Sequence, residues 1–168
     1  MGEEILRMEN ITKIYPNGVM ANKDVTLSVQ KGEIHALMGE NGAGKSTLMK
    51  ILFGFESKDS GEIYFEGKKL ETSSPAETIK RGIGMVHQHF MLVDSLKVYE
   101  NIVLGMEPRK GPFTDGKKAS QMVADMAKKY NLNVDPEAKV ETLSVGLKQK
   151  VEILKVLARG AKLLILDE

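Results

Sequence analysis

A glycine-rich stretch in the first third of the chain has the residue types and spacing that suit a bound phosphate chain. Residues 39–46 fit the pattern G-x-x-x-x-G-K-[ST] at every fixed position. Glycines let the backbone curl so that successive N–H groups point at phosphate oxygens, and a following helix adds its N-terminal N–H groups. Lys45 is expected to reach the outer phosphates and the Ser46 hydroxyl to ligate Mg²⁺. The stretch therefore predicts a site for a nucleoside triphosphate with Mg²⁺, in preference to a plain glycine turn. The residues expected to line it are Gly39, Glu40, Asn41, Gly42, Ala43, Gly44, Lys45, Ser46 and Thr47.

Two carboxylates, Asp167 and Glu168, directly follow an apolar run at 163–166. Carboxylates at the carboxyl edge of a parallel strand lie where α/β sheets bind ligands. Asp167 is expected to hold Mg²⁺, directly or through water, and Glu168 to polarise an attacking water as a general base. An acidic pair after a strand is weak evidence alone, and the glycine-rich stretch is what gives it weight.

Three polar segments have both functional and plainer interpretations. The amide of Gln88 could contact Mg²⁺ and the attacking water, although an ordinary loop amide is the simpler interpretation from spacing alone. His87 and His89 flank it, but no third ligand is evident for a His-x-His metal site. Ser144 suits a helix N-cap and Gly146 permits close approach of an anion, while a plain helix cap would also explain them.

Short apolar runs supply the strands that must position these residues. The runs at 34–38, 83–87 and 163–166 each lead into a candidate site segment, and each predicts a buried strand. Alternating apolar residues over 25–29 predict a half-buried strand, and residues 61–70 predict a hairpin.

Helices are predicted between these strands. Ser74, Pro75 and Glu77 carry the signals of a capped helix start, and Gly82 ends that helix. The composition of 106–118, rich in Gly, Pro and Lys, predicts an exposed loop. Apolar spacing predicts further helices over 48–55, 95–105, 119–130 and after residue 146. Strands alternating with helices predict the α/β class, a mostly parallel sheet covered by helices.

Composition restricts the classes of partner. The 168 residues fit one domain and include 42% hydrophobic residues. A net charge of +1 gives no electrostatic reason to expect nucleic acid. The chain has no cysteine, which excludes disulfides and thiolate metal sites. No stretch approaches the roughly 20 apolar residues that span a bilayer, so we expect any membrane role to depend on a partner.

Together, in this order and spacing, the motifs resemble the nucleotide-binding domain of ABC transporters. In this resemblance residues 39–47 correspond to the Walker A loop, and Gln88 begins the Q-loop. Residues 143–149 match the family signature, and 163–168 are Walker B. Tyr15 matches the aromatic residue that stacks on adenine in the family.

The resemblance implies a P-loop NTPase, RecA-like core with an N-terminal antiparallel β subdomain and an inserted α-helical subdomain. It places the β-rich and P-loop part at about 1–90, the helical subdomain at about 91–143, and the signature helix with the Walker B strand at 144–168. The family continues past Walker B into a D-loop, a switch histidine and further core strands. We therefore expect the chain to be a partial domain that lacks the C-terminal core strands.

The resemblance also implies a function. Residues 39–47, 86–90 and 143–146 look most like the sugar and nucleoside importers, and resemble the nucleoside or lipoprotein-linked branch more than the ribose branch. This implies an ATPase subunit of an importer that uses ATP and Mg²⁺, at the inner face of the cell membrane in the cytoplasm. The expected partners are membrane permease subunits, which would meet it near the Q-loop and residues 94–105, and a second nucleotide-binding domain. A solute-binding protein would act indirectly.

Two departures from the family pattern qualify this expectation. Val145 and Leu147 replace a Gly and the Gln of the general signature, so the contact to a partner domain's nucleotide could be rearranged. Glu168, the expected base, is also the last residue and would carry the terminal carboxylate. We therefore expect the 168 residues alone to bind nucleotide with little turnover. A nucleotide-binding module without turnover and a soluble ABC ATPase acting on ribosomes or DNA stay open as alternatives.

Overall fold

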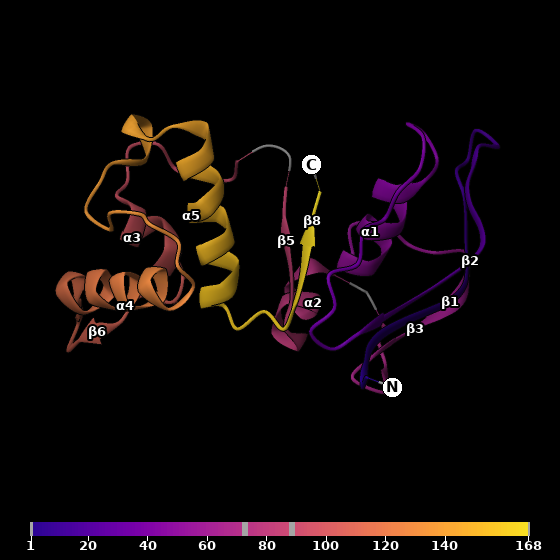
Figure 1. Ribbon diagram of the computed structural model, residues 1–168, viewed down its shortest axis with the longest axis horizontal. Coiled ribbons are helices and arrows are strands. Elements are labelled where there is room, and N and C mark those ends of the chain that lie inside the picture. The colour runs from indigo at the N-terminus through magenta and orange to yellow at the C-terminus, as the bar shows by residue number, and fades with distance from the viewer. Residues whose placement is uncertain (1, 72–73, 88–89, 168) are drawn as a thin grey trace. The chain divides into compact units, whose positions relative to one another are not determined.

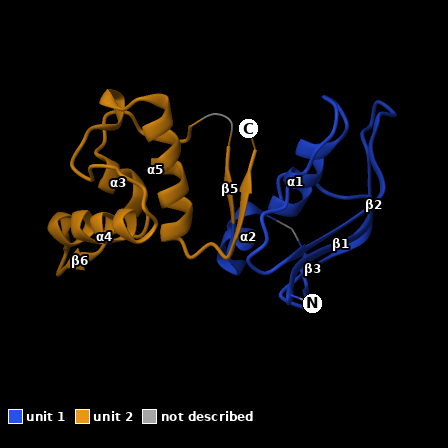
Figure 2. Cartoon of the chain, in the orientation of Figure 1, with its two compact units in different colours: residues 1–83 blue, residues 84–168 orange. Residues whose placement is uncertain are grey.

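The computed structural model describes residues 2–71, 74–87 and 90–167 (Figure 1). The chain divides into two compact units, 1–83 and 84–168 (Figure 2). The predicted site residues Gln88 and Glu168, and also His89, lie outside the described residues.

A four-stranded antiparallel sheet dominates the first unit. Its strand order is β2-β1-β3-β4, in which β1 (Glu4–Ile14) pairs with both long neighbours. The predicted strand over 25–29 lies within β2 (Met20–Gln30), where Val29 is buried and the residues alternate as expected. The predicted hairpin is β3 (Ser60–Phe65) with β4 (Lys68–Lys69).

An irregularity in β1 decides which of its side chains face inward. Asn10 has a φ of 51°, and the pairing of β1 with β2 shifts register between Met8 and Ile11. The extra residue breaks the two-residue alternation, so that Met8 is buried before the shift, and Ile11 and Lys13 are buried after it. A lysine is thereby placed on the inner face of a strand.

Two helices complete the first unit. The helix α1 (Lys45–Phe53) follows the glycine-rich stretch directly and packs against β2 and α2. The helix α2 (Pro75–Arg81) confirms the predicted caps, because the Ser74 side chain accepts a hydrogen bond from the Glu77 N–H at 3.4 Å. Gly82 terminates it in the left-handed conformation.

The predicted buried strand over 34–38 is wrong. Residues 33–40 form no strand, and every one of them is exposed. Ile34 is 98% exposed and Met38 is 88% exposed. An apolar run is buried in a sheet only when neighbouring strands and covering helices lie against it, and the run alone cannot specify those neighbours.

A pair of strands distant in sequence lies, except for Ile83, in the second unit. β5 (Ile83–Val86) and β8 (Leu163–Leu166) lie side by side (Figure 1). The Asp167 N–H, just past the end of β8, donates to the C=O of Val86, the last residue of β5, at 3.2 Å. The carboxyl ends of the two strands therefore coincide, as in a parallel pair. Both runs form strands as predicted, and β5 is buried throughout, but in β8 only Ile165 is buried and Leu166 is 63% exposed.

Three helices and a short 3-10 turn form the core of the second unit. They are α3 (Val98–Val103), α4 (Gly116–Lys129), η1 (Val140–Thr142) and α5 (Val145–Ala158). Their buried apolar residues form one cluster. Its members are Val98, Ile102, Val103, Ala119, Val123, Ala127, Val140, Val151 and Leu154.

The other elements predicted for this unit differ from the observed ones in where they begin and end. The helix α3 is shorter than the predicted 95–105, and α4 begins before residue 119 because Asp115 caps it by accepting from the Lys118 N–H. The predicted loop over 106–118 contains a small hairpin, β6 (Arg109–Lys110) with β7 (Phe113–Thr114), and the start of α4, and most of its residues are exposed as expected. None of the helices in the described part of the chain combines the length and apolar character that a bilayer crossing requires.

Candidate functional site

The glycine-rich loop has a backbone that only glycine adopts without strain at two positions. Gly42 and Gly44 have φ values of 85° and 84°. At Gly44 space is also restricted, because a Cβ there would lie 2.1 Å from the Ala21 carbonyl oxygen. At Gly42 a Cβ would meet nothing within 4 Å. Gly42 is therefore needed only for the positive φ of the loop. Gly44 is needed for its positive φ and also because it lets the loop pack closely against β2.

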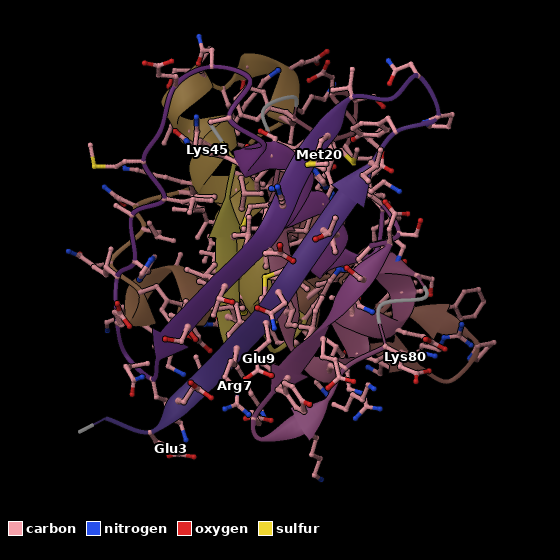
Figure 3. The ribbon with its side chains drawn as sticks, turned by 90° about the vertical axis from the view of Figure 1, so that its right-hand side faces the viewer. Glu3, Arg7, Glu9, Met20, Lys45 and Lys80 are labelled. Carbon is pink, nitrogen blue, oxygen red and sulfur yellow. The ribbon has the colours of Figure 1, made fainter. Side chains whose placement is uncertain are left out.

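Lys45 and the start of α1 face the interior of this curl. The Lys45 ammonium donates to the Gly39 and Glu40 carbonyl oxygens at 2.6 and 2.8 Å, which folds the side chain back across the loop. Gly44, the N-cap of α1, contributes no side-chain cap, and the positive end of the helix dipole adjoins the loop. Figure 3 shows Lys45 at the end of the sheet where β2 begins at Met20, opposite to the end marked by Glu3. A phosphate would meet a lysine ammonium and a positive helix end here.

A buried asparagine attaches the loop to the sheet. Asn22 of β2 is 5% exposed, and its Nδ2 donates to the Gly44 carbonyl oxygen at 3.2 Å. The same oxygen accepts from the Leu48 N–H at 2.9 Å, the first hydrogen bond of α1. The Asn22 Oδ1 is buried without a hydrogen-bond partner among the described residues. A buried unsatisfied oxygen costs about 1–3 kcal/mol, so Asn22 holds the loop at some expense to stability.

Tyr15, which the family resemblance assigns to adenine stacking, lies beside α1. It lies in the turn between β1 and β2, where its N–H donates to the Val19 carbonyl oxygen at 2.8 Å. Its hydroxyl lies 3.5 Å from the Thr47 hydroxyl of α1, and either group can donate. The buried Lys13 ammonium lies 5.6 Å from the centroid of the Tyr15 ring and donates to the Ser57 hydroxyl at 3.3 Å. The ring is therefore fixed from two sides.

A carboxylate shapes the turn that leads toward the loop. Glu33 accepts a hydrogen bond from the Gln30 N–H at 2.7 Å, and its other oxygen lies 2.9 Å from the His35 Nδ1. The Gln30 N–H, and then His35, hold the pKa of Glu33 below its ordinary value. The carboxylate is thus ionised at neutral pH and fixes the end of β2.

The signature segment starts α5 in the predicted way. The Ser144 hydroxyl is the N-cap and accepts from the Leu147 N–H at 3.4 Å. Val145 is exposed, and a Cβ added at Gly146 would meet nothing within 4 Å. The segment therefore presents an open, small-residue surface at the start of a helix, where an anion could approach.

The structure distributes the predicted residues between the two units. In the first it brings Tyr15 and Thr47 together and places Lys45 over the loop. In the second, Asp167 follows β8 at the end shared with β5, as expected of a residue at the carboxyl edge. No cluster of three His, Cys, Asp or Glu side chains that could hold a metal occurs among the described residues.

Two residues of this site, Asn22 and Lys13, are absent from the predictions made from sequence. Each is a polar residue at an inward position of a strand. Lys13 could not be recognised as inward without knowing the irregularity at Asn10, which changes the alternation. Asn22 is likewise out of phase with the inward positions 25, 27 and 29, because Asp24 (φ 47°) and a register shift interrupt β2, so alternation alone would place it on the outer face.

Comparison with known proteins places these features in a family. A family model described as ABC transporter matches residues 22–168. The guanosine import ATP-binding protein NupO of Bacillus subtilis is 54% identical over 99% of this chain and 32% of its own length. The nucleoside import ATP-binding protein NupA of Lactococcus lactis is 50% identical over 99% of this chain and 33% of its own length. The chain therefore spans about a third of the length of these curated relatives.

Solved structures match over nearly the whole chain. A nucleotide-free ATP-binding cassette from an ABC transporter superposes with a TM-score of 0.83 at 30% identity, over 98% of this chain and 69% of that one. A dimeric ATP-binding cassette in a post-hydrolysis state, bound to ADP and Pi, gives a TM-score of 0.77 at 29% identity, over 98% and 74% of the two chains. The fold is that of the P-loop NTPases, which confirms the fold class predicted from the motifs.

Proposed function

Because the chain belongs to the ABC transporter family, we propose that it is the ATP-binding part of an importer in which ATP binding and hydrolysis drive transport. The observation that carries the proposal is the phosphate loop. Its two glycines with positive φ, the Lys45 ammonium over the curl and the adjoining start of α1 form a cradle for a triphosphate. The importer-like relatives support the transport role.

In this proposal the loop residues 39–47 hold the phosphates of ATP through backbone N–H groups. Lys45 exchanges its two carbonyl partners for the outer phosphate oxygens. Tyr15 stacks on adenine, for which its ring is already fixed beside α1 by Thr47 and Lys13. Tyr15 and residues 39–47, to which we assign these contacts, all belong to the first unit.

Mg²⁺ fits the donors that the chain offers, since a serine hydroxyl and carboxylate and amide oxygens are hard ligands. We assign these roles to Ser46, Asp167 and Gln88. When bound, the ion would neutralise charge that develops on the phosphates. Glu168 would accept a proton from the attacking water, while Gln88 orients that water. The new bond joins the water oxygen to the γ-phosphorus, and the bond from that phosphorus to the bridging oxygen of ADP breaks.

Ser144 and Gly146 act on a second domain in this proposal. The hydroxyl and the small residue lie at the exposed start of α5, where the helix end favours an anion. We propose that they contact the ATP held by the loop of a second nucleotide-binding domain, an arrangement that the dimeric neighbour supports. We propose that the 168 residues alone bind ATP with little turnover.

The transported solute is proposed to be a nucleoside, on the basis of the two nucleoside-import relatives. The domain would work at the inner face of the cell membrane against permease subunits, with a solute-binding protein acting upstream. Uptake of labelled guanosine and of labelled galactose, in cells that lack and then regain the gene, tests this step. Restored guanosine uptake supports the proposal, and restoration of galactose uptake alone contradicts it.

ATP turnover tests the composite site. Phosphate release by the full-length protein should fall by at least about tenfold in Lys45→Met and in Ser144→Ala, since each removes a polar contact to a charged phosphate. A mixture of the two variants should recover part of the activity. In a mixed pair, the intact loop of Ser144→Ala faces the intact signature of Lys45→Met, which leaves one complete site. Equal activity of Ser144→Ala and the unmodified protein would contradict the role of the second domain.

A further inference from the structure

The main chain that follows Gln88 is held by side chains and not by a neighbouring strand. Residues 90–93 belong to no helix or strand. Even so, the N–H and the C=O of Met91 and of Val93 each form a hydrogen bond with a side chain. In a β-ladder, residues two apart exchange both groups with the next strand in this way. Side chains here take the place of a strand.

Met91 is held by two charged residues of α5. Its N–H donates to Glu152 Oε1 at 2.6 Å, and its C=O accepts from the Lys155 ammonium at 2.6 Å. The two side chains lie 4.0 Å apart and form an ion pair. Glu152 is only 4% exposed, and a carboxylate so buried is stable only when paired and hydrogen-bonded. Hydrogen bonds to ionised groups are roughly twice as strong as neutral ones.

Val93 is held by a buried amide of α3. Its N–H donates to Asn101 Oδ1 at 2.7 Å, and its C=O accepts from Asn101 Nδ2 at 3.0 Å. The same Nδ2 lies 3.2 Å from the Lys97 carbonyl oxygen. The segment is therefore bound at alternate residues, to α5 through Met91 and to α3 through Val93.

Two more side chains, one on α5 and one at its C-cap, bind residues that follow Val93. The Lys148 ammonium lies 2.8 Å from Asp94 Oδ1, and Arg159 Nη2 donates to the Leu104 carbonyl oxygen at 2.9 Å. The spacing of Lys148, Glu152, Lys155 and Arg159 is four, three and four residues, which places all four on one face of the helix. One face of α5 thus holds the chain from Met91 to Leu104.

We propose that Glu152, acting with Lys155, is a positioning residue that makes the segment after Gln88 and the signature helix α5 move as one body. Ser144 begins that helix eight residues before Glu152. A displacement at Gln88 is then passed through the Met91 peptide to α5, and so to the signature. The inference rests on the function proposed above for Gln88 and Ser144.

Hydrogen exchange of single amides, followed by NMR with and without saturating Mg·ATP, tests this coupling. Without nucleotide, the Met91 amide should exchange about tenfold faster or more in Glu152→Ala, because its acceptor is lost. Glu152→Gln, which keeps an oxygen acceptor, should stay closer to the unmodified chain. Lys150→Met is the matched control, since Lys150 also lies on α5 but forms no hydrogen bond or ion pair among the described residues.

On adding Mg·ATP, exchange should slow over 39–47, 90–97 and 144–152 in the unmodified chain and in the control. In Glu152→Ala the first two responses should persist while the response over 144–152 is lost, which a residue that only stabilises the fold would not produce. Lys155→Met, which keeps the aliphatic stem, should weaken the same response if Glu152→Ala does not fold. A response over 144–152 that survives in both variants, with the Met91 amide released, would overturn the inference. The absence of any response over 39–47 in the unmodified chain would instead overturn the proposed function, and this inference with it.

Discussion

Replacing Gly44 with alanine tests how closely the phosphate loop is built onto the sheet. The added Cβ would lie 2.1 Å from the Ala21 carbonyl oxygen and 2.8 Å from Asn22 Nδ2, at a φ of 84°. A left-handed conformation costs a non-glycine residue about 1–2 kcal/mol. Overpacking adds about 1–3 kcal/mol, because a backbone carbonyl cannot move aside as a flexible side chain does. We therefore expect Gly44→Ala to lower the free energy of unfolding by about 2–5 kcal/mol.

Two other glycines separate these contributions. Gly42 and Gly67 have φ values of 85° and 72°, and a Cβ at either would meet nothing within 4 Å. Alanine at each should therefore cost only the conformational part, about 1–2 kcal/mol. Gly67 lies in the turn between β3 and β4, outside the phosphate loop, so its variant is the control for ATP affinity.

Urea unfolding gives the stability of each variant, and equilibrium titration with Mg·ATP gives its affinity. Gly44→Ala should unfold at the lowest urea concentration and bind ATP at least about tenfold more weakly, since the start of α1 is displaced from the loop. Gly67→Ala should bind ATP as the unmodified chain does. If Gly44→Ala and Gly67→Ala lose the same stability, the close approach of the loop to β2 is not a constraint and the reasoning is refuted.

Further expectations concern the adenine platform, a surface ion pair and a helix cap. Tyr15→Ala should weaken ATP binding about tenfold, because stacking on a base is worth about 1–3 kcal/mol, whereas Tyr15→Phe, which loses only the hydroxyl near Thr47, should stay within about threefold in a competition titration. A hydrogen bond from Lys69, and then one from a neighbouring tyrosine, lower the pKa of Glu62 below its ordinary 4.5, so its contribution to stability is present at neutral pH and lost as pH falls through the lowered value. Glu62→Gln should therefore flatten the dependence of unfolding free energy on pH as the pH falls below about 4.5, and an unchanged slope would contradict the ion pair. Ser144→Ala should cost about 1 kcal/mol in urea unfolding, with Ser144→Asp close to the unmodified chain.

The parts of the fold that depend on local chemistry could be predicted from the sequence. The helix α2 starts and ends where Ser74, Pro75 and Gly82 predict, because capping is decided within a few residues. The phosphate loop, the hairpin at 60–69 and the signature cap were predictable for the same reason. Motif spacing also sufficed for the family, which the comparisons confirm.

The parts that depend on distant neighbours could not be predicted. The run at 34–38 has the composition of a buried strand and is exposed, since burial requires partners that the run does not encode. The inward position of Lys13 follows from an irregular residue in β1. Glu152 is a lone acid in an apolar stretch of α5, and only the fold shows that Met91, 61 residues earlier, is its partner. Each of these positions depends on register or on tertiary packing that the local pattern does not encode.

Calorimetric titration of the chain with ATP and with AMP, in the presence of Mg²⁺, tests the central claim most directly. If the loop at 39–47 grips the outer phosphates, ATP should bind at least about a hundredfold more tightly than AMP, which lacks them. Lys45→Met should lower the affinity for ATP by about tenfold or more and leave AMP unaffected, because hydrogen bonds to charged groups contribute about 1.5–3 kcal/mol. Equal affinities for ATP and AMP, or unchanged ATP binding by Lys45→Met, would contradict the assignment of this loop as a triphosphate site.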